Sequence, residues 1–133
     1  MYFFYILDVS IINITKKLTF MESQKIDMFM MMNAKFFESY HLNAVREKLI
    51  SLDESKWPMV QTLQLKDPTT ALIISIVGGG HLGIDRFYIG DTGLGIAKLL
   101  TCGGFMIWTI VDWFLIMGAT REKNMEMFQN ALY

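Results

Sequence analysis

The sequence has little cysteine and no surplus of positive charge. Its 133 residues include one cysteine, Cys102, which rules out an internal disulfide and offers no set of thiolates for zinc. The formal net charge of -1 argues against a nucleic-acid partner, because phosphates attract proteins with an excess of lysine and arginine. We therefore expect no nucleic acid, no metal and no cofactor.

Apolar residues are abundant instead. Hydrophobic residues make up 53% of the chain and charged residues only 19%, whereas a soluble domain has about 45–50% and about 25%. The imbalance is local: residues 68–84 carry no ionisable side chain except His81, while residues 21–67 hold six basic and seven acidic ones. This composition favours a lipid environment for part of the chain.

Two long apolar runs dominate the second half of the sequence. The first begins at Pro68, where proline presets a helix start, and stays apolar through Ile84. It covers about 17 residues, or roughly 25 Å of helix. The second, residues 99–120, covers about 22 residues, or roughly 33 Å. With a glycine-rich turn at residues 85–98 between them, the runs predict a hairpin of two transmembrane helices over residues 66–120.

Residues 21–65 predict an N-terminal region of short amphipathic helices in water. Apolar residues recur every three or four positions in two stretches, first at Ile26, Phe29 and Met30, then at Leu42, Val45, Leu49 and Leu52. Residues 35–39 break the pattern, and Pro58 suits the start of a third helix. We expect these faces to pack on one another. The alternative is a self-association surface that includes Met28 and residues 30–32.

The two ends of the chain read differently from the rest. Residues 1–20 form an atypical leader, because the lysines Lys16 and Lys17 follow the apolar stretch, whereas a signal peptide has its positive charge first. Met21 opens a well-formed start, so residues 1–20 could reflect a misassigned start codon. Residues 121–133 are expected to form a polar C-terminal tail.

Residues 78–83 match the pattern G-x-G-x-x-G and give the strongest enzyme hypothesis, a dinucleotide-binding protein. The context disagrees, because glycines interrupt residues 85–95, where a long helix should follow. The glycines fit helix packing better: Ser75, Gly79 and Gly83 are spaced to share one helix face, and small residues allow helices in lipid to approach closely. Gly103 and Gly104 are assigned the same role. No catalytic constellation is present, and we expect the protein not to be an enzyme.

Asp112 is the one charged residue within the second run. An ionised carboxylate at mid-membrane costs about 2.5–3.5 kcal/mol, so it should be paired, protonated or placed at a helix interface. Counting residues from the turn places Asp112 level with Ser75 on the first helix and too deep for His81. We predict that Asp112 meets Ser75 or a second subunit. A structural role is favoured over a proton or ion site, since a relay needs several such groups.

The turn combines charge with aromatic residues. Asp85 and Asp91 could neutralise Arg86, which could instead bind a lipid phosphate. Phe87, Tyr88, Trp108 and Trp113 suit a membrane interface or a contact between helices. We favour a turn whose own charges satisfy one another and fix the geometry of the hairpin.

The sequence from Lys66 onward resembles the TM-two domain family, known by an Asp-Arg-Phe signature between two membrane helices. The resemblance rests on the signature Asp85-Arg86-Phe87-Tyr88 and, in order around it, on Asp67-Pro68, Gly78-Gly79, Leu82-Gly83, Gly93-Leu94-Gly95, Gly103-Gly104, Ile107-Trp108 and Asp112-Trp113. Residues 21–65 resemble the cytosolic leader of bacterial members. The resemblance implies a multi-pass membrane protein of bacterial type and no defined reaction.

Together these observations predict an all-α protein with a membrane helical hairpin preceded by short cytosolic helices. We expect a non-enzymatic interaction or assembly component of the cytoplasmic membrane. Its partners would be the lipid bilayer and either further copies of itself or other membrane proteins. The alternative is a small oligomeric pore or transporter element that uses Asp112. Basic residues outside the hairpin favour cytosolic termini.

Overall fold

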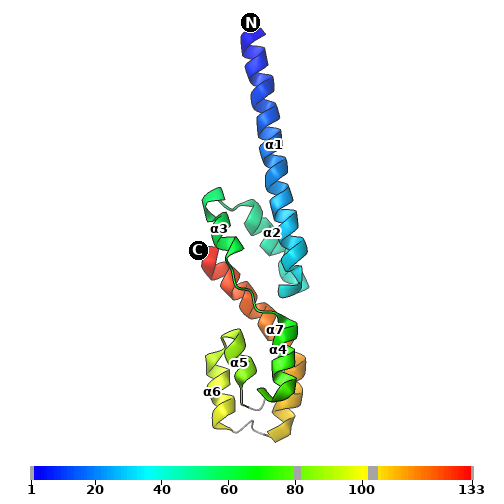
Figure 1. Ribbon diagram of the computed structural model, residues 1–133, viewed down its shortest axis with the longest axis vertical. Helices are drawn as coiled ribbons and strands as arrows, with labels where there is room; N and C mark the ends of the chain where they lie inside the picture. The colour runs from blue at the N-terminus through cyan, green and yellow to red at the C-terminus, as the bar shows by residue number, and fades with distance from the viewer. Residues whose placement is uncertain (1, 80–81, 102–104, 133) are drawn as a thin grey trace.

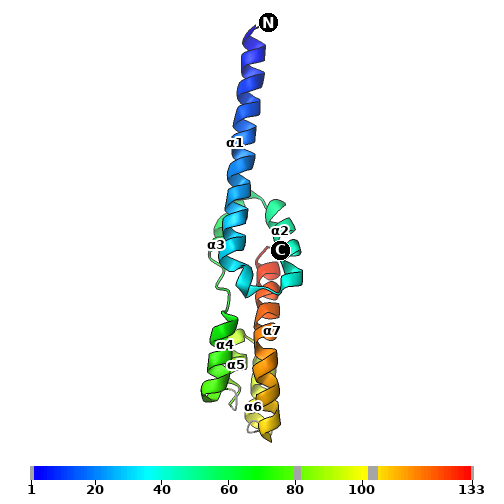
Figure 2. The same cartoon turned by 90° about the vertical axis from the view of Figure 1, so that its right-hand side faces the viewer.

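The computed structural model describes residues 2–79, 82–101 and 105–132, and every regular element in these ranges is helical (Figure 1). The expected all-α class is confirmed. The molecule is elongated, with the start of α1 at one end and α5 and α6 at the other (Figures 1 and 2). Its elements are α1 (Tyr2–Asn33), η1 (Ala34–Phe36), η2 (Ser39–His41), α2 (Leu42–Ile50), η3 (Glu54–Lys56), α3 (Trp57–Gln61), α4 (Pro68–Ile74), a π-helical turn (Ser75–Gly79), α5 (Ile84–Ile89), α6 (Thr92–Leu100) and α7 (Phe105–Leu132).

The middle of the molecule is a helical cap, formed by residues 21–65 together with residues 121–132 of α7. Its core buries side chains from α1, α2, α3 and α7, namely Ile26, Phe37, Val45, Leu49, Trp57, Val60, Met125, Phe128 and Leu132. The Phe128 ring lies 5.7 Å from that of Phe37 in an edge-to-face arrangement. The amphipathic faces expected for residues 21–65 therefore do pack on one another.

Neither end of the chain is a separate segment. Residues 2–20 are the first part of α1, which continues without a break because it contains no glycine or proline. The start of translation at Met21 stays a prediction. Residues 121–132 are not a polar tail: they extend α7, and their apolar side chains complete the core of the cap. The sequence pattern misled because the apolar residues Met125, Phe128 and Leu132 are separated by polar residues along the chain but come together in the core.

The helix start expected at Pro68 is confirmed. The carboxylate of Asp67 accepts hydrogen bonds from the backbone N–H groups of Thr69, at 2.8 Å, and Thr70, at 3.3 Å. Pro68 takes the first helical position, where it loses no helical hydrogen bond. The ammonium group of Lys35 also binds this carboxylate, at 3.0 Å, and holds the pKa of Asp67 below its ordinary value. A cap residue thus fixes the start of α4.

The simple hairpin expected for residues 66–120 is not what the structure contains. The helical segment that begins at Pro68 ends at Gly79, and the next long helix begins at Phe105. Residues 85–98, expected as a turn, form α5 and most of α6, which fold back beside α4 and α7 (Figures 1 and 2). Within the described residues, no helix combines the length and the apolar character needed to cross a bilayer.

We use the name hairpin unit for α4, the π-helical turn, α5, α6 and residues 105–120 of α7. Its small apolar core contains Ala71, Ile89 and Ile116, which come from α4, α5 and α7. α7 crosses the whole of the hairpin unit and then enters the cap, so one helix belongs to both parts of the molecule (Figure 2).

Asn124 joins the two parts where the chain passes from the cap to α4. Its side chain is fully buried. The amide oxygen accepts the Lys66 N–H at 2.7 Å, and the amide nitrogen donates to the carbonyl oxygens of Lys66, at 2.7 Å, and Phe36, at 2.8 Å. One side chain on α7 therefore satisfies three backbone groups of the connecting segments.

Asn124→Ala should destabilise the protein by about 1–3 kcal/mol, because it leaves these buried backbone groups without partners. The matched control is Asn130→Ala, at an exposed position on the same helix. It makes the same change in helix propensity without removing a buried hydrogen bond. Thermal unfolding followed by circular dichroism would compare the two variants, and equal stabilities would contradict this role for Asn124.

Candidate functional site

Two glycines set the shape of the segment that carries the Asp-Arg-Phe signature. Gly83 precedes α5 with φ of 72°, and Gly90 follows it with φ of 86°, both in the left-handed region that other residues rarely adopt. A Cβ on Gly83 would lie 2.7 Å from the carbonyl oxygen of Gly95. Only glycine therefore allows the start of α5 to approach α6 this closely.

The predicted stripe of Ser75, Gly79 and Gly83 on one helix face does not form. The helix ends at Gly79 through a π-helical turn, and Gly83 lies beyond it in a left-handed conformation. Gly83 does permit a close approach, but to Gly95 on α6. Gly103 and Gly104, like His81, lie outside the described residues.

The two aromatic residues of the signature hold α5 in place from different sides. Phe87 packs over Gly95, where an added Cβ would lie 3.0 Å from the ring. Tyr88 is partly buried against the core of the hairpin unit, and the ammonium of Lys66 lies 5.5 Å from its ring centroid. The signature residues Asp85 to Tyr88 are thus helical residues between packed elements.

Five charged side chains form an alternating network between α5, α6 and α7. In order they are Asp91, Arg86, Asp112, Lys98 and Asp85. The guanidinium of Arg86 lies 3.6 Å from Asp91 and pairs with Asp112. The ammonium of Lys98 pairs with Asp112 as well and lies 3.1 Å from Asp85. Asp85 also accepts the Arg86 backbone N–H at 2.9 Å. Each cation thus lies between two carboxylates.

The network is buried, although the hairpin unit is small. The side chains of Asp85, Asp112, Arg86 and Lys98 are 0%, 5%, 8% and 12% exposed, and Asp91 at the rim is 25% exposed. Charges removed from water are tolerated when opposite charges and hydrogen bonds compensate them, and breaking such a pair leaves a costly unpaired charge. The network therefore ties α5 and α6 to the middle of α7.

Asp112 was predicted to meet Ser75 or a second subunit, and the contact with Ser75 does not form. Asp112 contacts Arg86 and Lys98, and the buried hydroxyl of Ser75 has no hydrogen-bond partner among the described residues. We expected residues 85–98 to form the turn between the two helices, away from the level of Asp112. Because α5 and α6 fold back beside α7, Arg86 and Lys98 reach the level of Asp112. The grouping of Asp85, Arg86 and Asp91 was expected, but Asp85 pairs with Lys98 and not with the guanidinium.

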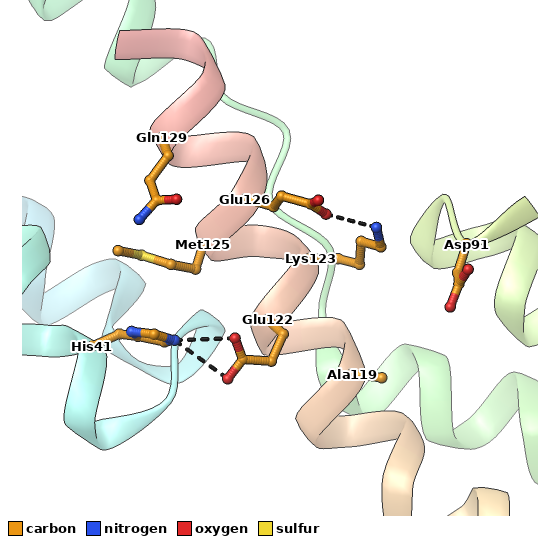
Figure 3. A pocket seen from close by; sticks show the side chains of 8 residues that line it. All are labelled: His41, Asp91, Ala119, Glu122, Lys123, Met125, Glu126 and Gln129. Atoms are coloured by element: carbon orange, nitrogen blue, oxygen red, sulfur yellow. Dashed lines mark hydrogen bonds and ion pairs between the residues drawn. The ribbon is translucent and has the colours of Figure 1, made fainter. Parts of the chain in front are cut away.

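A second polar cluster lies where α7 enters the cap (Figure 3). His41 Nε2 lies 3.1 Å from the carboxylate of Glu122, and the Tyr40 hydroxyl donates to the same carboxylate. Hydrogen bonds from Tyr40 and His41 lower the pKa of Glu122. Sequence reasoning missed this cluster. It borders a cavity of about 460 Å³ lined by His41, Asp91, Ala119, Glu122, Lys123, Met125, Glu126 and Gln129.

A further cavity of about 490 Å³ lies between this cluster and the charge network, with Tyr40 and Glu122 on one side and Arg86 and Asp112 on the other. In the described part of the chain, no group of three or more histidine, cysteine or acidic residues could hold a metal ion. The arrangement of charges supports packing between helices.

The family model of the TM2 domain matches residues 64–114, which run from the segment before α4 through α5 and α6 to Asp112 and its neighbours on α7. Residues 64–114 of this chain thus match the TM2 domain. The resemblance to the TM-two family inferred from the Asp-Arg-Phe signature is confirmed. The TM2 domain thus ends within α7, and residues 121–132 of the same helix lie outside it.

The relatives are TM2 domain-containing proteins of animals. The chain is 52% identical over 48 residues to TM2 domain-containing protein 3 of Xenopus tropicalis, with 36% of this chain and 19% of that protein covered. Over the same length it is 50% identical to the human TM2 domain-containing protein 3, with coverage of 36% and 19%. It is 52% identical to the Drosophila melanogaster protein almondex, with coverage of 36% and 16%.

The matching segment spans less than a fifth of the length of these relatives. They are eukaryotic, so they lend no support to the expected bacterial type. No solved structure matches the chain.

Asp112→Asn should destabilise the protein by about 3–5 kcal/mol, because it leaves Arg86 and Lys98 as buried cations with too little negative charge. Asp91→Asn is the matched control, since it removes a carboxylate from the exposed end of the same network and should cost less than about 1 kcal/mol. Chemical denaturation in detergent would measure both changes. Equal effects would mean that the burial of a carboxylate in the network does not determine how much it contributes to stability.

Proposed function

We propose that the chain is a multi-pass integral membrane protein whose TM2 domain lies in the bilayer and acts as a non-enzymatic interaction or assembly component. The observation that carries this proposal is the distribution of polarity in the hairpin unit, where charges lie inside and apolar side chains lie outside. Large exposed side chains surround the charge network, namely Ile73, Ile76, Val77, Leu82, Leu94, Ile96, Leu99, Leu100, Ile110, Phe114 and Leu115.

This distribution suits hydrocarbon better than water. So many exposed large apolar side chains are unusual on a monomer in water and mark a membrane or protein contact. Charged side chains in a membrane face the protein interior and pair with one another, as Arg86 and Asp112 do. The cap carries exposed ion pairs, such as Lys25–Glu54 and Arg46–Asp27, which supports a cap in water beside a hairpin unit in lipid.

Each charge of the network has an opposite charge beside it. This pairing favours a structural role, in which the network holds the helices together. A protein that presents surfaces to partners needs such a fixed arrangement of helices. The second candidate is a pore or transporter element that uses Asp112, and the cavity bordered by Arg86 and Asp112 favours it. Engagement of Asp112 by two cations argues against a carboxylate that binds a passing ion.

Membrane insertion can be tested with one charge on the apolar surface. Phe114 is 82% exposed on α7, so Phe114→Lys removes no packed contact but should weaken insertion by about 2.5–3.5 kcal/mol. Met59→Lys, on the exposed face of α3 in the cap, is the control and should change nothing. Alkaline-washed membranes should retain the natural chain and the control but lose much of the Phe114 variant. Release of the natural chain into the wash would contradict the proposal.

We further propose that the cap and both termini are cytosolic. Thr101 follows directly after the last residue of α6, and α6 ends at the end of the hairpin unit farthest from the cap (Figure 1). The start of α6 lies near the cap, since Asp91 lines the same cavity as Lys123. In a Cys102→Ser background, Thr101→Cys should react with an impermeant maleimide added outside intact cells, and Gln61→Cys in the cap only after permeabilisation. The opposite pattern would reverse the orientation.

A further inference from the structure

The first two-thirds of α1 stands clear of the other elements. In Figures 1 and 2 it projects beyond α2 and α3 with no neighbouring helix. Its described side chains from Asp8 to Lys25 are all exposed, and several are large and apolar. We propose that this part of α1 pairs with α1 of a second copy of the chain in a parallel coiled coil.

Five of the exposed apolar side chains of α1 lie at the spacing of a heptad repeat, while others, such as Ile12 and Phe20, lie outside it. Ile11, Ile14, Leu18, Met21 and Met28 are separated by three, four, three and seven residues, and are 56%, 59%, 55%, 48% and 64% exposed. The same spacing continues toward the N-terminus in the sequence at residues 4 and 7. Among the seam positions from residue 4 to residue 28, only position 25 is polar, and Lys25 is ion-paired with Glu54 of the cap. Alternating spacings of three and four over at least three heptads are the pattern of a coiled-coil seam.

This seam is separate from the face that α1 buries in the cap. The cap receives Ile26, Phe29 and Met30. Met21 and Met28, which belong to the seam, stay exposed where α1 passes the cap. The seam therefore cannot be explained as part of the core of this chain, and it faces a direction in which a second helix could pack.

The charges beside the seam favour two parallel copies in register. If Ile11 and Leu18 occupy position a of the heptad, Lys17 occupies position g and Glu22 the next position e. In a parallel coiled coil, g of one helix faces the following e of the other, so Lys17 meets Glu22 of the second copy. An antiparallel pair would place e beside e, and Asp8 and Glu22 would repel each other. Neither Lys17 nor Glu22 has an ion-pair partner among the described residues.

The chain offers a closely matched pair of variants for the test. Ile11 lies in the seam and Ile12 beside it, and they are 56% and 57% exposed in the single chain. Light scattering on the full chain in mild detergent should detect a dimer. Ile11→Glu should raise the dimer dissociation constant about tenfold or more, because it places a charge in the seam. Ile12→Glu should leave the constant within about threefold, and circular dichroism should report the same helix content for both.

Three results would overturn the proposal. The first is a natural chain that stays monomeric at the highest concentration measured. The second is an equal loss of dimer in both variants, as expected if lipid surrounds this part of α1. The third is an equal persistence of the dimer in both, as expected if the hairpin unit alone holds it together.

Charge exchange tests the parallel register. Lys17→Glu should weaken the dimer, because like charges then face each other, and adding Glu22→Lys should restore it. In a Cys102→Ser background, Leu18→Cys at position a should form a disulfide between copies on mild oxidation, whereas Phe20→Cys, outside the seam, should not. Failure of the second substitution to restore the dimer, or crosslinking at residue 20 alone, would exclude a parallel seam. This inference does not depend on the proposed membrane function.

Discussion

The contact of Arg86 with Asp112 is the interaction on which the hairpin unit depends. It connects the short helix α5 to α7, the helix that belongs to both parts of the molecule. Lys98 joins the same carboxylate from α6, so one acidic side chain gathers three elements. Because these groups are buried, each would be costly without the others, and the arrangement is stable only as a whole.

Much of the cap could be predicted from the sequence. Apolar residues at helical spacing marked the buried faces of α1 and α2, and Pro68 after Asp67 marked the start of α4. These features are local, and each is visible within a window of a few residues. The Asp-Arg-Phe signature was equally visible, and it led to the right domain.

The pairing inside the hairpin unit could not be predicted in this way. Hydropathy locates apolar runs along the chain, but it does not reveal that a charged segment between them folds back alongside. The available signal was the pair of glycines at residues 83 and 90, whose left-handed conformations enclose α5. Similarly, the polar surface of residues 121–132 hid their apolar face, whose partners lie about 70–100 residues earlier in the sequence.

The continuity of α7 has a mechanical consequence. An unbroken helix resists bending, so a tilt imposed on its first half is carried into its second half. The thickness of a bilayer can set the tilt of a helix that contacts it. In this protein the second half of α7 forms part of the core of the cap and holds Asn124 against the connecting segment. If the hairpin unit lies in a bilayer as proposed, the cap would reorient together with α7, and any partner bound to the cap would respond to the same change.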